Sequence, residues 1–199
     1  MSLIQIADRS TGDVVDAELV ADVSLDELVR TEVQFREFRK KRIAEAIAKG
    51  HALPASSEWD RGLKGSDDSG SYRYFGIRHQ GKIQGLMMLD CEPQPSRRPG
   101  HDKQRLLYVE FIETAPWNQS PFPRISRHYG GVGTGLLRTA IKESMEAGCE
   151  GRIGLHSLLE AEGFYRPSFQ DLGFDPAEDL RYFEMNEEQA QRLLRGETR

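Results

Sequence analysis

The segment with the clearest capacity for chemistry is the glycine-rich run Gly130–Gly135, which reads Gly-Gly-Val-Gly-Thr-Gly and precedes a stretch with helical spacing of apolar residues. Glycine lets backbone N–H groups approach a bulky anion closely. The first N–H groups of a helix lack partners and lie at the positive end of its dipole. The run therefore suits a pyrophosphate group. From the glycines alone, a flexible hinge before the helix is the alternative.

Two common nucleotide motifs do not describe this run. The P-loop requires Lys followed by Ser or Thr after its glycines, and no such pair follows Gly135. The dinucleotide fingerprint requires the spacing Gly-x-Gly-x-x-Gly and an acidic residue that closes the following strand, and the run has neither feature. Both nucleotide interpretations are therefore disfavoured.

Two carboxylates, Glu110 and Glu113, lie on the segment Leu106–Thr114, whose Val, Ile, Phe and Tyr content predicts a strand. A carboxylate beside a partly apolar cleft can have its pKa raised until it serves as a general base. Successive residues of a strand point to opposite faces, so Glu110 and Glu113 lie on opposite faces of a regular strand. At most one of them can then be the base unless a bulge intervenes, and Glu110 is slightly favoured. An ion pair with Arg is the alternative role for each. His156 is a third candidate for the base, and its alternative role is that of a structural histidine.

The elements that must position these residues are indicated by apolar periodicity. Residues 24 to 49 predict one or two helices, with Ser24 and Glu27 in the form of a capping box and Gly50 as the stop signal. Tyr72–Asp90 predicts a β-hairpin around a glycine-containing turn. A second long helix is expected over Gly133–Ala147.

Shorter elements complete a mixed α/β pattern. We expect strands at Arg152–Ser157 and Leu180–Met185, a short helix at Leu158–Tyr165 and a terminal helix at 186–196. Strands in mixed order with helices between them predict a mixed sheet with helices packed on it. Long loops are expected at 51–71, 92–105 and 116–128.

Composition restricts the class of protein. A chain of 199 residues with 38% hydrophobic and 30% charged residues is typical of one soluble globular domain. We expect a cytosolic protein, because there is neither a bilayer-spanning apolar run nor a secretory leader. The cysteines, Cys91 and Cys149, are too isolated to predict a disulfide or a zinc site. The net charge of -5 disfavours nucleic acid as the main ligand.

The glycine run resembles the coenzyme A loop of the GCN5-related N-acetyltransferase (GNAT) family, whose pattern is Gln or Arg, two residues, Gly, any residue, then Gly or Ala. Gly131 and Gly133 match this pattern, and His128 stands at the Gln or Arg position. Tyr72–Asp90 resembles the second and third strands of the family, and Leu106–Thr114 resembles its fourth.

The resemblance continues downstream and covers roughly residues 70 to 185. Ala161 and Tyr165 keep the spacing of the last family motif, Asn-x-x-Ala-x-x-x-Tyr. Leu158 replaces the Asn, and the segment Gly173-Phe174 arrives about four residues late.

The resemblance implies the GNAT-like fold, a mostly antiparallel central sheet flanked by helices. It implies a single domain with an N-terminal part (1–70), a core with the acetyl-coenzyme A site (71–185) and a C-terminal helix (186–199). It implies a backbone amide near Ile112 to Thr114 that polarises the thioester carbonyl. The residues implied to bind acetyl-coenzyme A are Ile112, Thr114, His128, Gly130, Gly131, Val132, Gly133, Thr134 and Gly135, and no metal is implied.

The implied reaction is direct attack of an amine on the thioester, which requires proton removal, oxyanion stabilisation and reprotonation of the thiolate. The motif spacing selects Tyr165 to hydrogen-bond or protonate the coenzyme A sulfur. In another register Phe169, which has no proton to donate, takes that position. The alternative role for Tyr165 is packing. The candidates for the base are Glu110, Glu113 and His156.

The leading functional hypothesis is an N-acetyltransferase whose acceptor is a primary amine on a small molecule or a protein. A non-catalytic acyl-coenzyme A binding or sensing module is the alternative, because His128, Leu158 and the late Gly173-Phe174 depart from the family pattern. A toxin-like acetyltransferase acting on charged transfer RNA is disfavoured by the negative net charge.

The acceptor itself is not encoded in a recognisable motif, because specificity resides in loops. Some loop residues either contact the acceptor or anchor the loops to the core. These are Trp59, Trp117, Asn118, Gln119 and Phe122. A homodimer is possible, since it is the commonest closed assembly.

Overall fold

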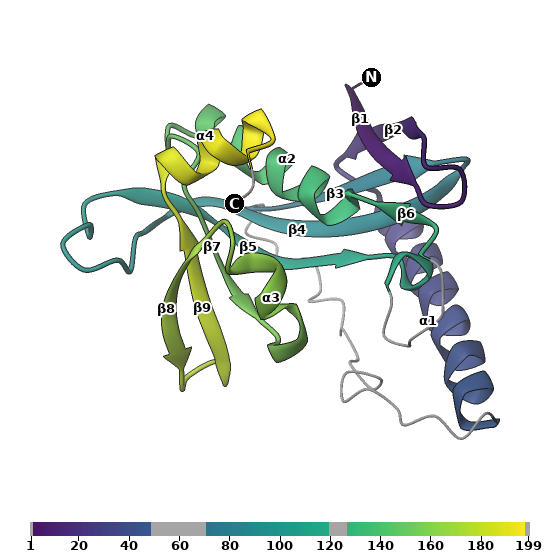
Figure 1. Ribbon diagram of the computed structural model, residues 1–199. Coiled ribbons are helices and arrows are strands. Elements are labelled where there is room, and N and C mark those ends of the chain that lie inside the picture. The colour runs from purple at the N-terminus through teal and green to yellow at the C-terminus, as the bar shows by residue number, and fades with distance from the viewer. Residues whose placement is uncertain (1, 49–70, 120–126, 198–199) are drawn as a thin grey trace. The chain divides into compact units, whose positions relative to one another are not determined.

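The computed structural model describes residues 2–48, 71–119 and 127–197, and within these residues the chain forms nine strands and four α-helices (Figure 1). The strands are β1 (Ser2–Asp8), β2 (Val14–Ala21), β3 (Tyr72–His79), β4 (Lys82–Pro95), β5 (Arg105–Thr114), β6 (Tyr129–Gly130), β7 (Ile153–Ser157), β8 (Gln170–Asp175) and β9 (Leu180–Met185). The helices are α1 (Leu25–Ala48), α2 (Val132–Glu146), α3 (Glu162–Tyr165) and α4 (Glu187–Arg195), with 3-10 turns at Pro116–Asn118 and Leu159–Ala161.

The strands hydrogen-bond in the order β6-β1-β2-β3-β4-β5-β7-β9-β8. The pairs β1–β2, β1–β6, β2–β3, β7–β9 and β8–β9 are antiparallel, whereas β5 and β7 are parallel. A parallel pair needs a crossover connection, and here the crossover contains α2. The predicted mixed, mostly antiparallel sheet with helices is therefore confirmed.

The Cα positions group into two compact units. The first unit comprises the described residues within Met1–Asp68, Tyr74–Leu86 and Glu113–Gly135. The second unit comprises those within Ser69–Arg73, Met87–Ile112 and Leu136–Arg199. Strands β3, β4 and β5 and helix α2 each contribute residues to both units.

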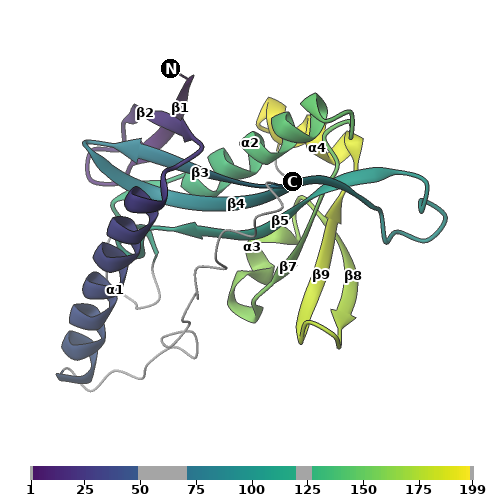
Figure 2. The ribbon, with the colours of Figure 1, turned by 180° about the vertical axis from the view of Figure 1, so that it is seen from behind.

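In the first unit, α1 is one uninterrupted helix (Figure 2). Its start is capped as predicted, because the Ser24 hydroxyl accepts a hydrogen bond from the Glu27 N–H at 3.3 Å. The Glu27 carboxylate pairs instead with Arg78 of β3 at 2.6 Å. The predicted stop signal, Gly50, lies outside the described residues.

The predicted hairpin forms from β3 and β4. Gln80 and Gly81, between the two strands, have φ values of 50° and 72°. Two successive left-handed residues are the requirement of a type I′ turn, whose twist matches that of paired antiparallel strands. The turn therefore fixes the start of β4, which runs on to Pro95, beyond the predicted end at Asp90.

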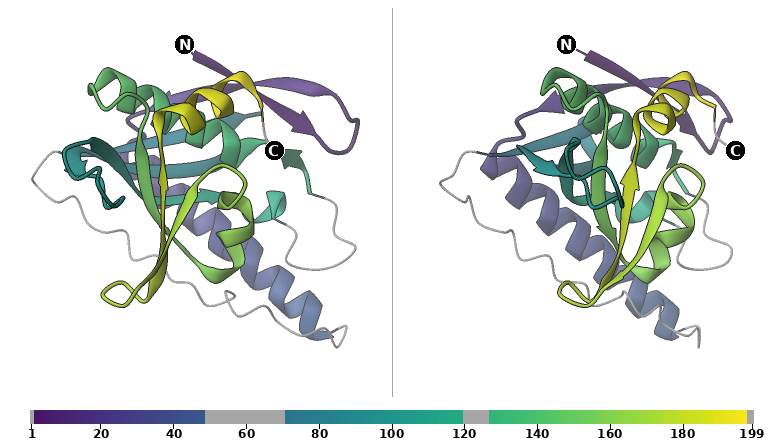
Figure 3. Two further views of the ribbon diagram at one scale, coloured as in Figure 1. Left: turned by 60° about the vertical axis from the view of Figure 1, so that its left-hand side comes forward. Right: turned by 90° about the vertical axis from the view of Figure 1, so that its left-hand side faces the viewer.

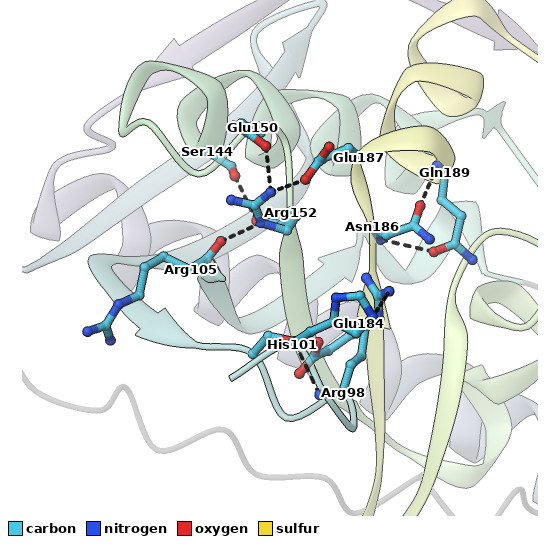
Figure 4. A network of polar contacts seen from close by, with 11 residues as sticks. Arg98, His101, Arg105, Ser144, Glu150, Arg152, Glu184, Asn186, Glu187 and Gln189 are labelled. Atoms are coloured by element: carbon cyan, nitrogen blue, oxygen red, sulfur yellow. Dashed lines mark hydrogen bonds and ion pairs between the residues drawn. The ribbon is translucent and has the colours of Figure 1, made fainter. Parts of the chain in front are cut away.

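In the second unit, a buried arginine joins the crossover to the C-terminal helix (Figure 4). The Arg152 Nε donates to the Arg105 carbonyl at 2.8 Å, and its Nη1 pairs with Glu150 at 2.7 Å and with Glu187 of α4. The Ser144 hydroxyl of α2 donates to the Arg152 carbonyl at 2.7 Å. These bonds fix the end of α2 and the start of α4 on β7.

The C-terminal elements form a compact group around β9. Helix α4 begins with a complete capping box between Asn186 and Gln189 and ends at Gly196, whose φ is 79° (Figure 4). Strand β8 pairs with β9, and the two lie side by side in both views of Figure 3. Their register shifts between Asp171 and Gly173, so the late Gly173 of the sequence occupies a bulge.

Candidate functional site

The glycine run begins helix α2, as the sequence predicts. Gly131 has a φ of 82°, and its carbonyl accepts the first helical hydrogen bond, from the Gly135 N–H at 2.8 Å. The N–H groups of Val132, Gly133 and Thr134 have no acceptor among the residues that the structure describes. Three such donors at the positive end of a helix dipole can bind an anion.

Two of the glycines lie in close contact with other side chains. A Cβ on Gly130 would overlap the guanidinium of Arg9, which lies against this residue. A Cβ on Gly135 would lie 2.9 Å from Ile4 Cγ2 and 3.0 Å from Ile77 Cδ1, so the first turn of α2 packs closely on β1 and β3. The start of α2 is therefore packed closely against β1 and β3 at Gly135.

Arg9 is a residue that no sequence pattern singled out. It follows β1, is exposed, and has no carboxylate partner in the described ranges. Its backbone N–H donates to the carbonyl of His128 at 2.8 Å, which holds the two residues side by side. The His128 imidazole is exposed. A cation thus lies at the glycine turn although the sequence has no Gln or Arg at position 128.

The segment that leads into the turn is fixed by a buried amide. Gln84 of β4 accepts hydrogen bonds from Trp117 Nε1 at 2.8 Å and from Asn118 Nδ2 at 3.1 Å. The Asn118 Oδ1 accepts from the Tyr129 N–H at 3.0 Å. The Gln119 amide donates to the Thr114 carbonyl at 2.7 Å.

Of the loop residues proposed as acceptor contacts, Trp117, Asn118 and Gln119 are therefore anchors of the chain in this structure. Trp117 also packs edge-on against two phenylalanines of α1, Phe35 and Phe38, at centroid distances of 5.4 Å. Trp59 and Phe122 lie outside the described residues.

Strand β5 loses one of its neighbours partway along its length. Its parallel ladder with β7 begins at Leu107 and ends at the pair Val109–Leu155, whereas β5 itself continues to Thr114 (Figure 1). Beyond Val109, no described strand pairs with β5 on the β7 side. An extended ligand chain can pair with such an open edge as an additional strand.

The two candidate bases on β5 have different surroundings. In the first unit, the Glu113 Oε1 accepts from Arg39 Nη2 of α1 at 2.6 Å, and the Glu113 side chain is 6% exposed. Burial lowers the pKa of the Arg39 guanidinium, which nonetheless stays charged at neutral pH. This ion pair is the structural role that the sequence left open for Glu113. In the second unit, Glu110 is half-buried and shares a strand face with Tyr108 and Ile112.

Tyr165 lies at the end of α3 and is 5% exposed. Its ring contacts Phe164, Phe169 and Phe183 at centroid distances of 5.1, 5.5 and 5.9 Å. Burial raises the pKa of the Tyr165 phenol above its ordinary value, so the hydroxyl carries its proton at neutral pH. That hydroxyl has no hydrogen-bond partner within the described part of the chain. Both registers of the last motif, Tyr165 and Phe169, thus fall in one aromatic cluster.

A chain of three polar side chains crosses the second unit from β5 to β8. The Tyr108 hydroxyl lies 2.6 Å from His156 Nδ1, and His156 Nε2 lies 3.1 Å from Asp175 Oδ2. Of the three residues, only His156 was a candidate from the sequence. Tyr108 and Asp175 were missed because 67 residues separate them, and only the strand order β5-β7-β9-β8 brings them together.

Two classes of site receive no support from the geometry. Within residues 2–48, 71–119 and 127–197, no three His, Cys, Asp or Glu side chains gather in a way that would hold a metal ion. In the same ranges, no helix combines the length and the apolar character needed to span a membrane.

The fold is the GNAT-like acyltransferase fold that the sequence resemblance predicts. It is similar to that of FeeM, an N-acyl amino acid synthase from uncultured soil microbes, with a TM-score of 0.53 and 12% identity over 89% of this chain and 96% of that chain. No protein-family model and no curated protein matches the sequence.

Two other solved structures share less of the geometry. A GNAT-family acetyltransferase from Listeria monocytogenes has a TM-score of 0.45 and 15% identity over 91% of this chain and 98% of that chain. The N-acetyltransferase YlbP of Bacillus subtilis, solved with coenzyme A, has a TM-score of 0.40 and 17% identity over 57% of this chain and 66% of that chain.

Proposed function

We propose that this protein is an N-acetyltransferase that moves the acetyl group of acetyl-coenzyme A to a primary amine. The observation that carries the proposal is the start of α2, where three backbone N–H groups behind the left-handed Gly131 have no acceptor within the described residues. In the family that the sequence resembles, the matching glycine pattern forms the coenzyme A loop. The fold of FeeM, an N-acyl amino acid synthase, also fits transfer of an acyl group to an amine.

In this proposal the pyrophosphate of the cofactor binds the N–H groups of the glycine run Gly130–Gly135. Arg9 supplies a cation at this turn, in the role that the family pattern gives to the residue at position 128. The pantetheine arm pairs with the open edge of β5, where Ile112 and Thr114 offer backbone groups.

The chemistry requires three groups around the thioester. The amine nitrogen attacks the carbonyl carbon, a backbone N–H near the end of β5 stabilises the oxyanion, and the carbon–sulfur bond breaks. Tyr165, which keeps its proton because it is buried, donates a hydrogen bond to the departing sulfur, and the thiolate takes its proton from solvent. Of the two carboxylates, Glu110 is the better candidate for proton removal, because Glu113 is engaged by Arg39.

The cofactor site is tested by thermal unfolding with and without acetyl-coenzyme A. A ligand at about 100 times its dissociation constant stabilises a protein by roughly 2.7 kcal/mol. For a chain of this size, the melting temperature then rises on the order of 5 to 10 °C. Free coenzyme A should give a comparable shift, because the contacts above are made with groups that both ligands carry. The absence of a shift with either ligand would overturn the proposed function.

Turnover separates an enzyme from the alternative, a non-catalytic acyl-coenzyme A binding module. Release of free thiol from acetyl-coenzyme A is followed with a panel of primary amines that includes amino acids, polyamines and lysine peptides. Amine-dependent thiol release supports the transferase. A stabilising shift without thiol release on any acceptor supports the binding module.

A further inference from the structure

We propose that Tyr108, His156 and Asp175 form a relay that removes the proton from the acceptor amine, with Tyr108 as the residue that touches the substrate. This inference rests on the proposed N-acetyltransferase function and adds the proton acceptor of its reaction. It differs from the carboxylate mechanism, in which Glu110 takes the proton directly.

The hydrogen bonds define the direction in which a proton can move. A carboxylate only accepts, so Asp175 Oδ2 at 3.1 Å fixes the proton of the neutral imidazole on His156 Nε2. His156 Nδ1 is then an acceptor, and the Tyr108 hydroxyl at 2.6 Å donates to it. The Tyr108 oxygen also accepts from the backbone N–H of His156, which leaves one lone pair for the N–H of an incoming amine.

Asp175 is held as a carboxylate by its other contacts. Its Oδ1 accepts from the Ala177 N–H at 3.0 Å, and its Oδ2 accepts from Arg97 Nη1 at 2.6 Å. The Ala177 N–H, Arg97 and His156, in that order, lower the pKa of Asp175 to about 2. The carboxylate is therefore ionised throughout the neutral range and can stabilise an imidazolium at position 156.

Tyr108 cannot act as a stable phenolate. Burial, and then the charges of Glu110 and Glu178, raise the pKa of its phenol well above the ordinary value. A proton that reaches the Tyr108 oxygen must therefore be matched by one that leaves toward His156. The 2.6 Å bond supplies this exit, which a tyrosine that merely packs in the core does not need.

Tyr108 lies where the open edge of β5 begins. It immediately precedes Val109, which forms the last ladder pair with β7. Tyr108, Glu110 and Ile112 share one face of β5, so an amine that approaches a thioester on this edge meets the Tyr108 hydroxyl directly or through one water.

Every proton in the transfer step has a donor and an acceptor. The amine nitrogen forms a bond with the thioester carbon and loses one proton to the Tyr108 oxygen, while the Tyr108 proton passes to His156 Nδ1. The carbon–sulfur bond breaks while Tyr165 donates a hydrogen bond to the departing sulfur. His156 releases its proton to solvent and the thiolate takes one from solvent, so the products are the amide and free coenzyme A.

Charged and titratable groups surround the imidazole on every strand that packs against it. Tyr108 and Glu110 come from β5, Tyr182 and Glu184 from β9, and Asp175 from β8. Tyr182 stacks on the His156 ring at a centroid distance of 4.8 Å, and Arg97 lies 4.4 Å above the Tyr182 ring.

Anchoring of the hairpin between β4 and β5 is the other role that this cluster can have. Ser96 Oγ and the Arg97 N–H both donate to the Glu184 carboxylate, and the Arg97 guanidinium pairs with Asp175. The bond between Tyr108 and His156 contributes nothing to that anchor. An experiment that removes only the Tyr108 hydroxyl therefore separates the two roles.

The test compares Tyr108→Phe with a control, Tyr182→Phe, which removes a phenolic hydroxyl that bonds to Glu184 from a ring that contacts His156. Rates with acetyl-coenzyme A and the best amine of the panel are measured from acid to alkaline pH. Tyr108→Phe should lower kcat at high pH by about 100-fold, the scale of general base catalysis. The melting temperature and the affinity for coenzyme A should stay close to those of the wild type. Tyr182→Phe should retain its rate within about twofold.

The ratio of wild-type to Tyr108→Phe rates cancels the titration of the amine itself. This ratio should fall toward one as the pH is lowered, because a protonated His156 Nδ1 accepts no proton in either protein. His156→Gln should show the same loss, and it carries the test if Tyr108→Phe does not fold. A merely structural role would leave the ratio independent of pH.

Five outcomes would overturn the relay. Equal rates for Tyr108→Phe and the wild type, or equal losses for Tyr108→Phe and Tyr182→Phe, would overturn the relay alone. Loss of the alkaline rate in Glu110→Gln, with a normal Tyr108→Phe, would establish the carboxylate as the base instead. A wild-type protein that binds no coenzyme A, or acetylates no amine, would overturn the proposed function and the relay together.

Discussion

The guanidinium of Arg9 lies against the glycine turn. The family pattern has its Gln or Arg at the position of His128, in a different part of the chain. The guanidinium occupies the space that a Cβ on Gly130 would need. The Arg9 backbone also holds His128 through the bond to its carbonyl. A charge-assisted bond to a phosphate is worth about 1.5–3 kcal/mol, so a single side chain can compensate for the missing Gln or Arg.

We therefore predict that Arg9→Gln weakens binding of coenzyme A. Loss of about 1.4 kcal/mol raises the dissociation constant about tenfold, and the loss should be smaller at high salt because an exposed charge is screened. Isothermal titration calorimetry measures both effects. Arg30→Gln, on the exposed face of α1, removes the same charge and serves as the control. Equal affinities for Arg9→Gln and this control would exclude Arg9 from the site.

The candidate site could be predicted where it depends on local sequence and not where it depends on strand order. The glycine turn was predicted because a helix start and its glycines are contiguous in the chain. Glu113 was predicted as a candidate base, but its partner Arg39 lies 74 residues away, and no local pattern joins them. The roles of Tyr165 and Glu110 remain predictions.

Helix α2 combines a start with unpaired N–H groups and close packing. Gly131 is required by its left-handed φ of 82°, and no heavy atom lies within 4 Å of a Cβ at that position. Gly135 has the opposite requirement, because Ile4 and Ile77 leave no room for a Cβ. The first turn of the helix is therefore held in place by packing on β1 and β3, while its N–H groups stay open.

We predict different costs for alanine at the two glycines. Gly135→Ala should lower the free energy of unfolding by about 1–3 kcal/mol, because the added methyl overpacks the contact with Ile4 and Ile77. Gly131→Ala should cost about 1–2 kcal/mol through its backbone conformation alone. Ile77→Val, which removes the Cδ1 atom 3.0 Å from the new methyl, should recover part of the loss when it is combined with Gly135→Ala and none when it is combined with Gly131→Ala. Urea unfolding curves measure all four values, and equal behaviour in the double variants would contradict the packing argument.

The elements that the sequence predicted are those with a long stretch of periodic apolar residues or with strong turn signals. Helices α1 and α2 and the hairpin β3–β4 combine apolar periodicity with a cap, a glycine stop or a type I′ turn. Strands β1 and β2 were not predicted individually, because each has only one buried residue, Ile6 and Ala17, and its apolar pattern is correspondingly weak. Strand β8 was missed because a bulge at Gly173 interrupts its alternation.

At the scale of the whole molecule, the chain combines two compact units with elements that belong to both. Strands β3, β4 and β5 and helix α2 each begin in one unit and end in the other. Opening one unit completely would break the hydrogen-bond ladder of a strand partway along its length. Partial unfolding of this kind exposes unpaired backbone groups, which are costly to leave unsatisfied. We therefore propose that the chain unfolds as a single cooperative domain.

Amide hydrogen exchange tests this proposal. The slowest amides of β1 and β2 in the first unit and of β7 and β9 in the second should exchange with the same free energy, because both need global unfolding. Coenzyme A at about 100 times its dissociation constant should raise both values by roughly 2.7 kcal/mol, although the proposed phosphate contacts lie in the first unit. If the slowest amides of the two units exchanged with different free energies, and coenzyme A raised only one of them, the units would unfold independently. A common free energy of exchange would instead mean that any ligand at the glycine turn stabilises the Tyr108–His156–Asp175 cluster as well.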